Sequence, residues 1–365
     1  MTMLTPRNGF SGDIETFLVQ TLIERFGPNH EWDTERVYLN RVPDLNGFMP
    51  ANILLVLQHC FIQNQALNDH IEKAKHRLLA YRKGHLAYYW PFNDGRSTIP
   101  NAPTLSKFEF LTLSPDADDT TVQQLVLHET QFFEPILNEL AFYRCDEINF
   151  IPPNPQRILG NWNGAYLAWF PERERCSLGK IETLDLGVSA NILWFLSRFG
   201  FTNHEGAQET AGWIKHILKN EFILSHPFFL TRYYPVPLLQ LYILARAVDL
   251  GQLVKAGFFS DEDIEMMKRL FKKMVPRSRY ESLLTLATAI HLNDRETFSK
   301  LRHILQSPIL DSGIYFAAPL VPIVTYQNPI FAFLAKQPFM RFRFESIALS
   351  AAIHLWCLQA AKQRF

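Results

Sequence analysis

The sequence predicts an all-α protein built as an (α/α)6 toroid, in which about twelve helices alternate between an outer and an inner ring. Two observations support this prediction. Helical periodicity recurs along the 365 residues while strand signals are sparse, and the helical segments fall into two alternating kinds. One kind is amphipathic and charged, and the other is nearly free of charge. A helix that is apolar on all sides must be surrounded by protein, so the uncharged segments are expected inside the charged ones.

The charged segments begin with ordinary helix starts. Ser11 precedes an acidic run, and Ser260 precedes another, which is the pattern of an N-cap followed by carboxylates that favour the first turn. These segments are the predicted outer helices: Asp13–Phe26, Leu67–Lys83, Phe132–Phe142, Glu205–Glu221, Asp261–Met274 and Asp294–Leu305.

The uncharged segments are the predicted inner helices. We find no repeat of fixed length, which a superhelical solenoid usually shows, so a closed toroid is favoured over that alternative. A single toroid domain is expected over residues 1–365. The inner segments start at Met49, Asp116, Leu186, Val236, Ser282 and Ser346.

The lengths of the connections predict where a site would lie. The chain passes quickly from an inner to the next outer segment, for example after Phe199 and after Leu292. Most return connections are long, such as 84–115 and 143–185. All long connections therefore meet at the end where the inner helices start, which we call the mouth. Long loops on a rigid scaffold are where function concentrates, so the site is predicted at the mouth.

Composition excludes some partners. Lys and Arg together number 36 and balance 36 Asp and Glu, so no basic stripe is available for nucleic acid or an anionic membrane. Four scattered cysteines and a start without an apolar run favour a cytoplasmic protein. The uncharged stretch Ile314–Ala335 is long enough to span a bilayer but contains three prolines. It is interpreted as a buried or pocket-lining loop, not as a transmembrane segment.

The stretch SPDADDTT places three carboxylates, Asp116, Asp118 and Asp119, just before an apolar run. One interpretation is a helix cap, because Ser114 and Pro115 form an ordinary helix start and first-turn acids complement the helix dipole. The other is a general acid. A cap needs one carboxylate, and crowding of three in an apolar environment raises a carboxyl pKa until the proton is held near neutral pH. Both interpretations remain open from the residues alone.

Aromatic side chains gather in the segments assigned to the mouth, which predicts an apolar ligand. A carbohydrate-active enzyme is an alternative, with Asp118 paired with Asp185 or Glu345 and with tryptophan platforms. A non-catalytic binding toroid is the third hypothesis. The expected ligand-binding residues are Tyr89, Trp90, Trp162, Trp169, Tyr233, Tyr234 and Phe344.

At its acidic motif the chain resembles class II terpene cyclases of the squalene–hopene type. Their motif is Asp-x-Asp-Asp, and residues 116–119 match every fixed position. The resemblance implies that Asp118 protonates an alkene or epoxide, that Asp116 and Asp119 orient and tune it, and that the ligand is a small isoprenoid. It also implies the toroid fold, shared with protein prenyltransferase β-subunits, over most of the chain.

Two further expectations concern cofactors and partners. The chain lacks the Asp-Asp-x-x-Asp motif of class I synthases, and His128, His291 and His354 sit late on inner segments, away from the mouth. No metal or other cofactor is therefore expected. Class II cyclases pair two toroids around their pocket, whereas this chain has room for one, so a homodimer is a candidate source of a second.

Overall fold

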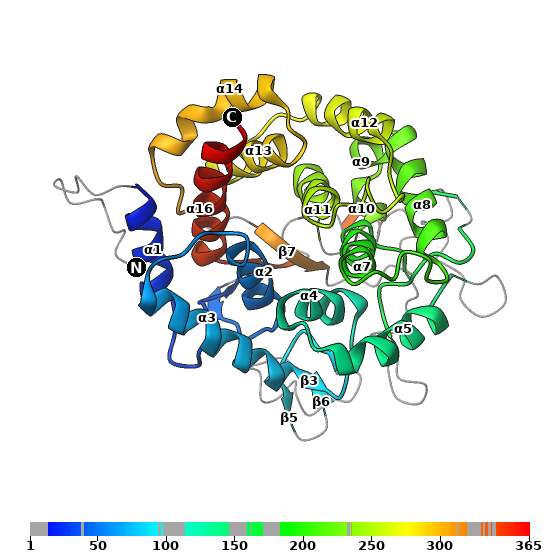
Figure 1. Cartoon of the computed structure of the whole chain (residues 1–365), viewed down its shortest axis with the longest axis horizontal. Helices are drawn as coiled ribbons and strands as arrows, with labels where there is room; N and C mark the ends of the chain where they lie inside the picture. The colour runs from blue at the N-terminus through cyan, green and yellow to red at the C-terminus, as the bar shows by residue number, and fades with distance from the viewer. Residues whose placement is uncertain are drawn as a thin grey trace.

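The structure, a computed structural model, is an all-α toroid with a small sheet at one end (Figure 1). It describes residues 14–37, 40–93, 96–97, 114–145, 159–160, 162–170, 183–231, 234, 236–311, 314–319, 330, 333–334, 337 and 341–365.

Six helices of the described chain form the inner ring. Each contacts its two neighbours in the order α2, α4, α7, α11, α13 and α16, and α16 returns to α2, so the ring closes. The closed ring confirms the toroid predicted from the uncharged segments. Its helices are α2 (Phe48–Leu57), α4 (Ala117–Leu127), α7 (Leu186–Arg198), α11 (Pro237–Leu250), α13 (Arg279–His291) and α16 (Ile347–Arg364).

The outer helices surround this ring and alternate with it along the chain (Figure 1). All six correspond to the charged segments of the sequence. The short helices α9 (Phe222–Ser225) and α10 (Pro227–Leu230) lie in the connection before α11. The outer helices are α1 (Ile14–Glu24), α3 (Gln65–Leu78), α5 (Phe133–Phe142), α8 (Ala207–Lys219), α12 (Asp261–Lys272) and α14 (Arg295–Leu301), the last followed by the 3₁₀ helix η5 (Arg302–Gln306).

Burial explains the difference between the two rings. All ten residues of α2 are buried, whereas α12 buries only Asp263, Met267, Leu270 and Phe271 and leaves its other charged residues partly or fully exposed. An inner helix touches neighbours on both sides and an outer helix behind it, so it has no face for charge. The charge pattern of the sequence therefore encoded the ring to which each helix belongs.

The inner helices begin at the same end of the toroid, as expected for the mouth. Side-chain caps accept backbone N–H groups there: Asp116 starts α4, Asp185 starts α7, Ser278 starts α13 and Ser346 starts α16. Each cap satisfies N–H groups that lack a partner inside the helix. The long outer-to-inner connections lead into these starts.

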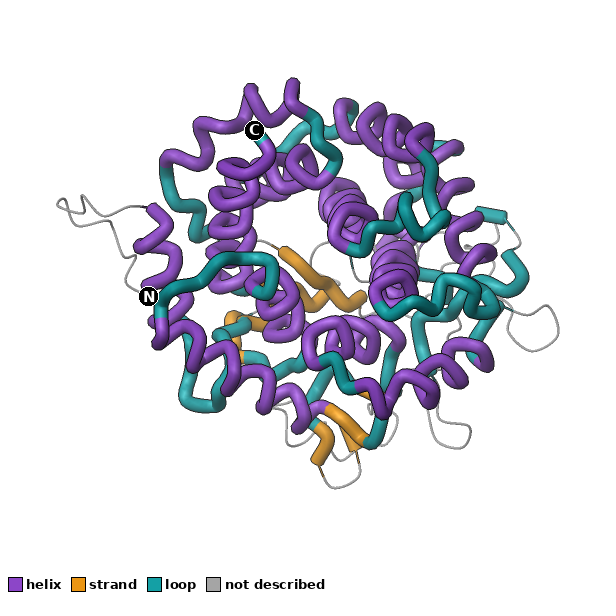
Figure 2. Tube along the Cα trace, viewed as in Figure 1, coloured by secondary structure: helices purple, strands orange, loops and turns teal. Residues whose placement is uncertain are grey.

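A four-stranded antiparallel sheet lies at the mouth, and the sequence did not predict it. Strand order is β2 (Arg41–Pro43), β1 (Glu35–Val37), β8 (Arg341–Glu345), β7 (Ile314–Pro319). Strand β8 runs directly into α16, and β7 and β8 are seen through the opening of the inner ring (Figure 2).

The loop interpretation of Ile314–Ala335 is therefore wrong for its first six residues, which pair with β8 in the register Phe316 opposite Phe344. Pairing between strands more than twenty residues apart leaves no local signal, which is why periodicity missed it. Most of 320–335 lies outside the described residues. Two short hairpins, β3–β4 (Arg82–Lys83, Leu86–Ala87) and β5–β6 (Phe92–Asn93, Arg96–Ser97), occupy the connection from α3 to α4.

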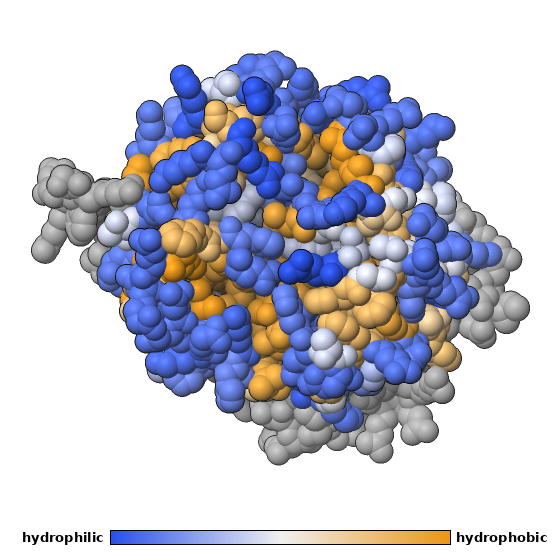
Figure 3. Space-filling view, in the orientation of Figure 1, coloured by the Kyte–Doolittle hydropathy of each residue, from blue (hydrophilic) through white to orange (hydrophobic). Residues whose placement is uncertain are grey.

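The opposite end of the toroid carries the short inner-to-outer connections. In the orientation of Figure 1, hydrophilic residues predominate around the rim, and hydrophobic residues are visible further in (Figure 3). Among the helices of the described chain, none combines enough length and hydropathy to cross a bilayer.

Gln359 of α16 forms hydrogen bonds with α1 and with the segment after α2, where the two ends of the inner ring meet. Its Oε1 accepts from the backbone N–H of Phe61 at 2.7 Å, and its Nε2 donates to the Phe61 carbonyl at 2.9 Å. The same Nε2 donates to Glu15 Oε1 of α1 at 2.6 Å. One side chain thus ties α16 to α1 and to the segment after α2.

Replacing this donor should weaken ring closure. Gln359→Glu keeps an acceptor for Phe61 but removes both donated bonds and opposes a second carboxylate to Glu15, so the free energy of unfolding should fall by about 1–3 kcal/mol. Urea unfolding would measure it. Gln20→Glu is a matched control on the exposed face of α1, expected within about 0.5 kcal/mol of wild type. Equal effects of the two changes would contradict this assignment.

Candidate active site

The three carboxylates of the acidic motif have different contacts, and Asp116 acts as a helix cap. Asp116 has an extended backbone and caps α4, accepting the Asp119 N–H at 2.5 Å. The chain on either side is held by two backbone bonds to the Trp169 segment, Ala117 N–H to Ala168 O at 3.0 Å and Phe170 N–H to Pro115 O at 3.0 Å. Asp116 is therefore the N-cap, and the predicted helix start with Ser114 as cap and Pro115 as first helical residue is wrong, because the helix begins only at Ala117. Trp169 lies beside Asp116.

Asp118 is not used as a cap, because its carboxylate contacts α7 and the segment before α11. Asn191 of α7 donates its Nδ2 to Oδ1 at 2.7 Å, and the Tyr234 hydroxyl donates to Oδ2. The side chain is buried, with 5% of its surface exposed. Asp118 is thus directed into the ring, whereas Asp116 lies at its rim.

A buried arginine extends this polar contact across the ring. Arg246 of α11, 1% exposed, donates Nη2 to Asn191 Oδ1 at 3.3 Å and Nη1 to Asn52 Oδ1 of α2 at 3.1 Å. Its guanidinium lies over the rings of Trp194 and Tyr242, with centroids 5.5 and 5.7 Å away. Side chains from α4, α7, α11 and α2 therefore form one connected polar chain inside an apolar ring.

Tyr234 is held in place from three directions. The Thr231 hydroxyl accepts the Tyr234 N–H at 3.1 Å and donates to Asp185 Oδ2 at 2.6 Å. Gln240 donates to the Tyr234 carbonyl at 2.8 Å. At Gly187 an added Cβ would lie 2.4 Å from Cε2 of the Tyr234 ring, so the ring occupies the space that a side chain would need. The first turn of α7 is thereby shaped to receive this tyrosine.

The carboxyl groups have raised pKa values for reasons that differ in detail. Burial raises the pKa of Asp118, while the hydrogen bonds from Tyr234 and Asn191 and the charge of Arg246 oppose the rise. Burial raises the pKa of Asp116 to about 7, and the charge of Asp118 adds to it. Asp119 has a pKa well above its usual range because of burial and then the neighbouring Asp116. The cluster can therefore hold protons near neutral pH.

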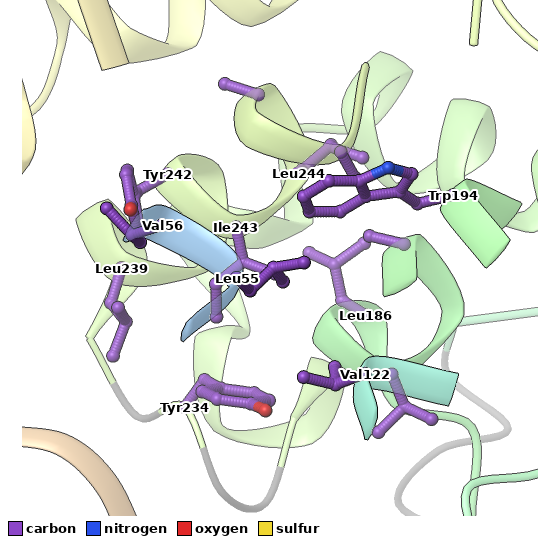
Figure 4. Close-up of a cluster of buried hydrophobic side chains, with 14 of the residues drawn as sticks. Leu55, Val56, Val122, Leu186, Trp194, Tyr234, Leu239, Tyr242, Ile243 and Leu244 are labelled. Atoms are coloured by element: carbon purple, nitrogen blue, oxygen red, sulfur yellow. The ribbon is translucent and has the colours of Figure 1, made fainter. Parts of the chain in front are cut away.

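The side chains that surround this network of polar residues are apolar. Figure 4 shows Leu55, Val122, Leu186 and Ile243, from four different inner helices, converging with Tyr234, Trp194 and Tyr242. Aromatic faces attract cations, and an apolar enclosure strengthens every charge interaction within it. The arrangement places the Asp118 carboxyl in an apolar and aromatic environment.

Four of the seven expected ligand-binding residues gather near the motif in addition to Tyr234. Tyr89 packs edge-on against Trp90 and Phe344, with centroids 5.5 and 5.3 Å apart, and the charge of Asp119 acts on its hydroxyl. Trp169 lies beside Asp116. Trp162 does not join them: its indole donates to Leu159 O and packs against Gly212 and His216 of α8. Tyr233 lies outside the described residues.

Three polar residues of the site were missed from the sequence. Asn191 and Arg246 are polar residues in the middle of mainly apolar inner helices, and that position is the signal that would have found them. Asp44 is a further buried acid in the segment before α2. Burial raises its pKa to about 6, and the Asn46 amide donates to it at 3.0 Å. Burial raises the pKa of the Tyr89 hydroxyl, and the charges of Asp44 and Asp119 raise it further. The sequence around Asp44 resembles a turn, so it gave no indication that Asp44 is buried.

The carboxylates proposed as partners in a glycosidase have other contacts. Asp185 caps α7 through the N–H groups of Gly187 and Val188. Glu345 forms an ion pair with Arg41 at 2.9 Å. These contacts are structural, and they lend no support to the paired-carboxylate alternative.

Comparison with solved structures places the fold. The type II terpene cyclase MstE from Scytonema, in complex with geranylgeranyl dihydroxybenzoate as substrate, matches with a TM-score of 0.55 and 12% identity, over 95% of this chain and 96% of that one. MstE with merosterolic acid A as product matches with a TM-score of 0.55 and 13% identity, over the same shares. A protein from Actinoplanes matches with a TM-score of 0.56 and 10% identity, over 95% and 99%.

The chain therefore has a terpenoid cyclase-like fold, as the acidic motif suggested. Identities of 10–13% show a shared fold. No protein-family profile matches the sequence, and a comparison with curated proteins finds no match either.

A double-mutant cycle can test the fit between Gly187 and Tyr234. Gly187→Ala should lower the free energy of unfolding by about 1–3 kcal/mol, because the new methyl group displaces the tyrosine ring. In a Tyr234→Ala background the space is free, so the same change should cost much less. Urea unfolding of the four proteins gives the coupling energy. If Gly187→Ala lowers the free energy of unfolding equally in both backgrounds, the Tyr234 ring is not the reason that residue 187 is a glycine.

Asp119→Asn should change how stability depends on pH. A carboxyl in the unfolded chain loses its proton near pH 3.9. The folded Asp119 retains its proton to a higher pH, so its stabilising contribution is complete below about pH 4 and is lost as pH rises through the folded pKa. The uncharged asparagine lacks this loss.

The variant should therefore gain stability relative to wild type as pH rises from about 4.5 to 7.5, at up to about 1.4 kcal/mol per pH unit. Urea unfolding at a series of pH values would measure the difference. A difference independent of pH would contradict the raised pKa.

Proposed function

We propose that this protein is a class II terpene cyclase-like enzyme that starts cyclisation or isomerisation of an isoprenoid by protonation. The observation that carries the proposal is the position of Asp118, a buried carboxyl directed into an apolar and aromatic ring. Burial raises the pKa of Asp118, and Asn191, Tyr234 and Arg246 stabilise the carboxylate that remains after transfer. An acid must satisfy both demands, because it has to hold a proton and then release it.

The proposed reaction needs no co-reactant. The alkene π pair takes the proton of the Asp118 carboxyl and forms a C–H bond, the O–H electron pair stays on the carboxylate, and a carbocation results. Further alkenes attack this cation as rings form. The last cation then loses one proton, which offsets the proton added in the first step, so substrate and product are isomers. Tyr89, Trp90, Trp169, Tyr234 and Phe344 are the proposed binding residues, through apolar contact and ring faces.

The solved structures support this assignment by analogy. MstE, a type II terpene cyclase, has a similar fold, and its structures contain geranylgeranyl dihydroxybenzoate as substrate and merosterolic acid A as product. A small isoprenoid ligand is the corresponding proposal for this chain. Asp116 and Asp119 would orient and tune Asp118 as its neighbours in the sequence, and the charge of Asp118 in turn raises the pKa of both.

Asp118→Asn should slow turnover strongly. Purified protein would be incubated in D2O with geranylgeranyl diphosphate, geranylgeranyl dihydroxybenzoate and squalene, and products analysed by mass spectrometry. Wild type should give a cyclised product with one deuterium bound to carbon, and the variant should be slower by about 10²–10⁴-fold. Asp294→Asn, which changes the buried cap carboxylate of α14, should keep activity. Product that persists in Asp118→Asn would remove the proposal.

A non-catalytic binding protein is the second candidate, because strands β7 and β8 lie at the end where the motif opens. If these strands close the mouth, a ligand could be held without reaction. The same incubation separates the two: bound isoprenoid recovered unchanged from wild type supports binding alone, and labelled cyclic product supports catalysis.

A further inference from the structure

Two buried asparagines accept hydrogen bonds from Arg246, and Asn191 also donates to Asp118. Asn191 Oδ1 accepts from Nη2 at 3.3 Å and Asn52 Oδ1 accepts from Nη1 at 3.1 Å. The Asn191 amide nitrogen donates to Asp118 Oδ1 at 2.7 Å, whereas that of Asn52 donates to the backbone carbonyl of Phe48 at 3.0 Å. Arg246 thus contacts α2 and α7 at once, and reaches Asp118 through Asn191.

The guanidinium decides which way the Asn191 amide points. Arginine has donors and no acceptor, so only the amide oxygen can face it. The amide nitrogen must then face Asp118. With the amide reversed, donors would oppose each other at Arg246 and acceptors would oppose each other at Asp118, and both pairs are buried. Arg246 therefore fixes the orientation of Asn191 by charge and hydrogen-bond polarity.

This orientation determines where a proton can sit on Asp118. A proton on Oδ1 would collide with the N–H group that already points at that oxygen. Oδ2 faces the Tyr234 hydroxyl instead, and a hydroxyl can both accept and donate. It can accept from the neutral acid before transfer and, after rotation, donate to the carboxylate.

We propose that Arg246 acts through Asn191 as a positioning residue that holds the acid proton of Asp118 on Oδ2, beside the Tyr234 hydroxyl. The proposal deepens the proposed function and rests on it for its catalytic meaning. It specifies that the reacting alkene must approach Oδ2 next to Tyr234. In the transfer the Oδ2–H bond breaks, the proton bonds to an alkene carbon, and the electron pair remains on Oδ2.

The charges around Asp118 fit this division. The charge of Asp118 raises the pKa of its sequence neighbours Asp116 and Asp119, while Arg246 of α11 favours the Asp118 carboxylate. Tyr234, just before α11, and Asn191 of α7 donate to it. Helix α2 contains no titratable side chain and contributes Asn52 to Arg246. The cation is thus separated from the acid by one oriented amide.

The test measures the Asp118 carboxyl directly and without substrate. Its C=O stretch when neutral is obtained by infrared difference between wild type and Asp118→Asn, with and without ¹³C-labelled aspartate. In wild type the carbonyl oxygen is Oδ1, which accepts from Asn191. Asn191→Leu removes that bond, so the band should move to higher frequency. Asn52→Leu is the matched control, since it removes the other amide partner of Arg246 and should leave the band in place.

Two further variants test the role of the cation. Arg246→Lys keeps a donor without an acceptor and should hold the band near wild type, whereas Arg246→Met should move it as Asn191→Leu does. Circular dichroism and thermal melting confirm that each protein compared is folded.

Activity provides a separate readout. Asn191→Leu should lower kcat by about 100-fold or more, as loss of a donor to developing charge does elsewhere. Asn52→Leu should lower it less than about tenfold. An unmoved band in Asn191→Leu, or an equal shift in Asn52→Leu, overturns the positioning role. Absence of any product from wild type overturns the proposed function instead, and the infrared comparison still decides the position of the proton.

Discussion

The enclosure of six apolar helices by six charged ones is the constraint on which the rest of the structure depends. An inner helix contacts two inner neighbours and an outer helix, so any polar side chain on it must find its partner inside the ring. Asp118, Asn191, Arg246 and Asn52 meet this requirement together. Each comes from a different inner helix, and each bonds to the next. Closure of the ring thus creates the polar chain, because separate helices would leave these groups in water.

The same enclosure has two opposite effects on the ionisation of Asp118. Burial disfavours the carboxylate, whereas Tyr234, Asn191 and Arg246 favour it. An exposed aspartate would experience neither effect strongly, since water solvates its charge and screens its neighbours. The clamp of Thr231, Asp185 and Gln240 on Tyr234, together with the missing side chain at Gly187, shows that the tyrosine position is built into the first turns of α7 and α11. The site is therefore a property of the inner ring more than of the loops around it.

Much of the fold could be predicted from the residues. Charge on one set of helices and its near absence on the other assigned every outer and inner helix of the ring, and loop lengths located the mouth. The sheet could not be predicted, because β7 and β8 pair across more than twenty residues and β8 pairs with β1 from the other end of the chain. Tryptophan placement was equally beyond reach: Trp169 joins Asp116, whereas Trp162 packs on the outer helix α8. An aromatic residue in a connection has no periodicity to indicate which ring it faces.

By itself the sequence determined the ring, the end at which the inner helices start and the three acids placed there, since each of these follows from local patterns of charge, capping and length. Only the tertiary structure decided what each acid does. Asp116 caps α4, and Asp118 turns inward to Asn191 and Tyr234, which are 73 and 116 residues away. Hydrogen bonds over such separations exist only once the ring has closed, so their partners are fixed by packing and not by neighbouring residues.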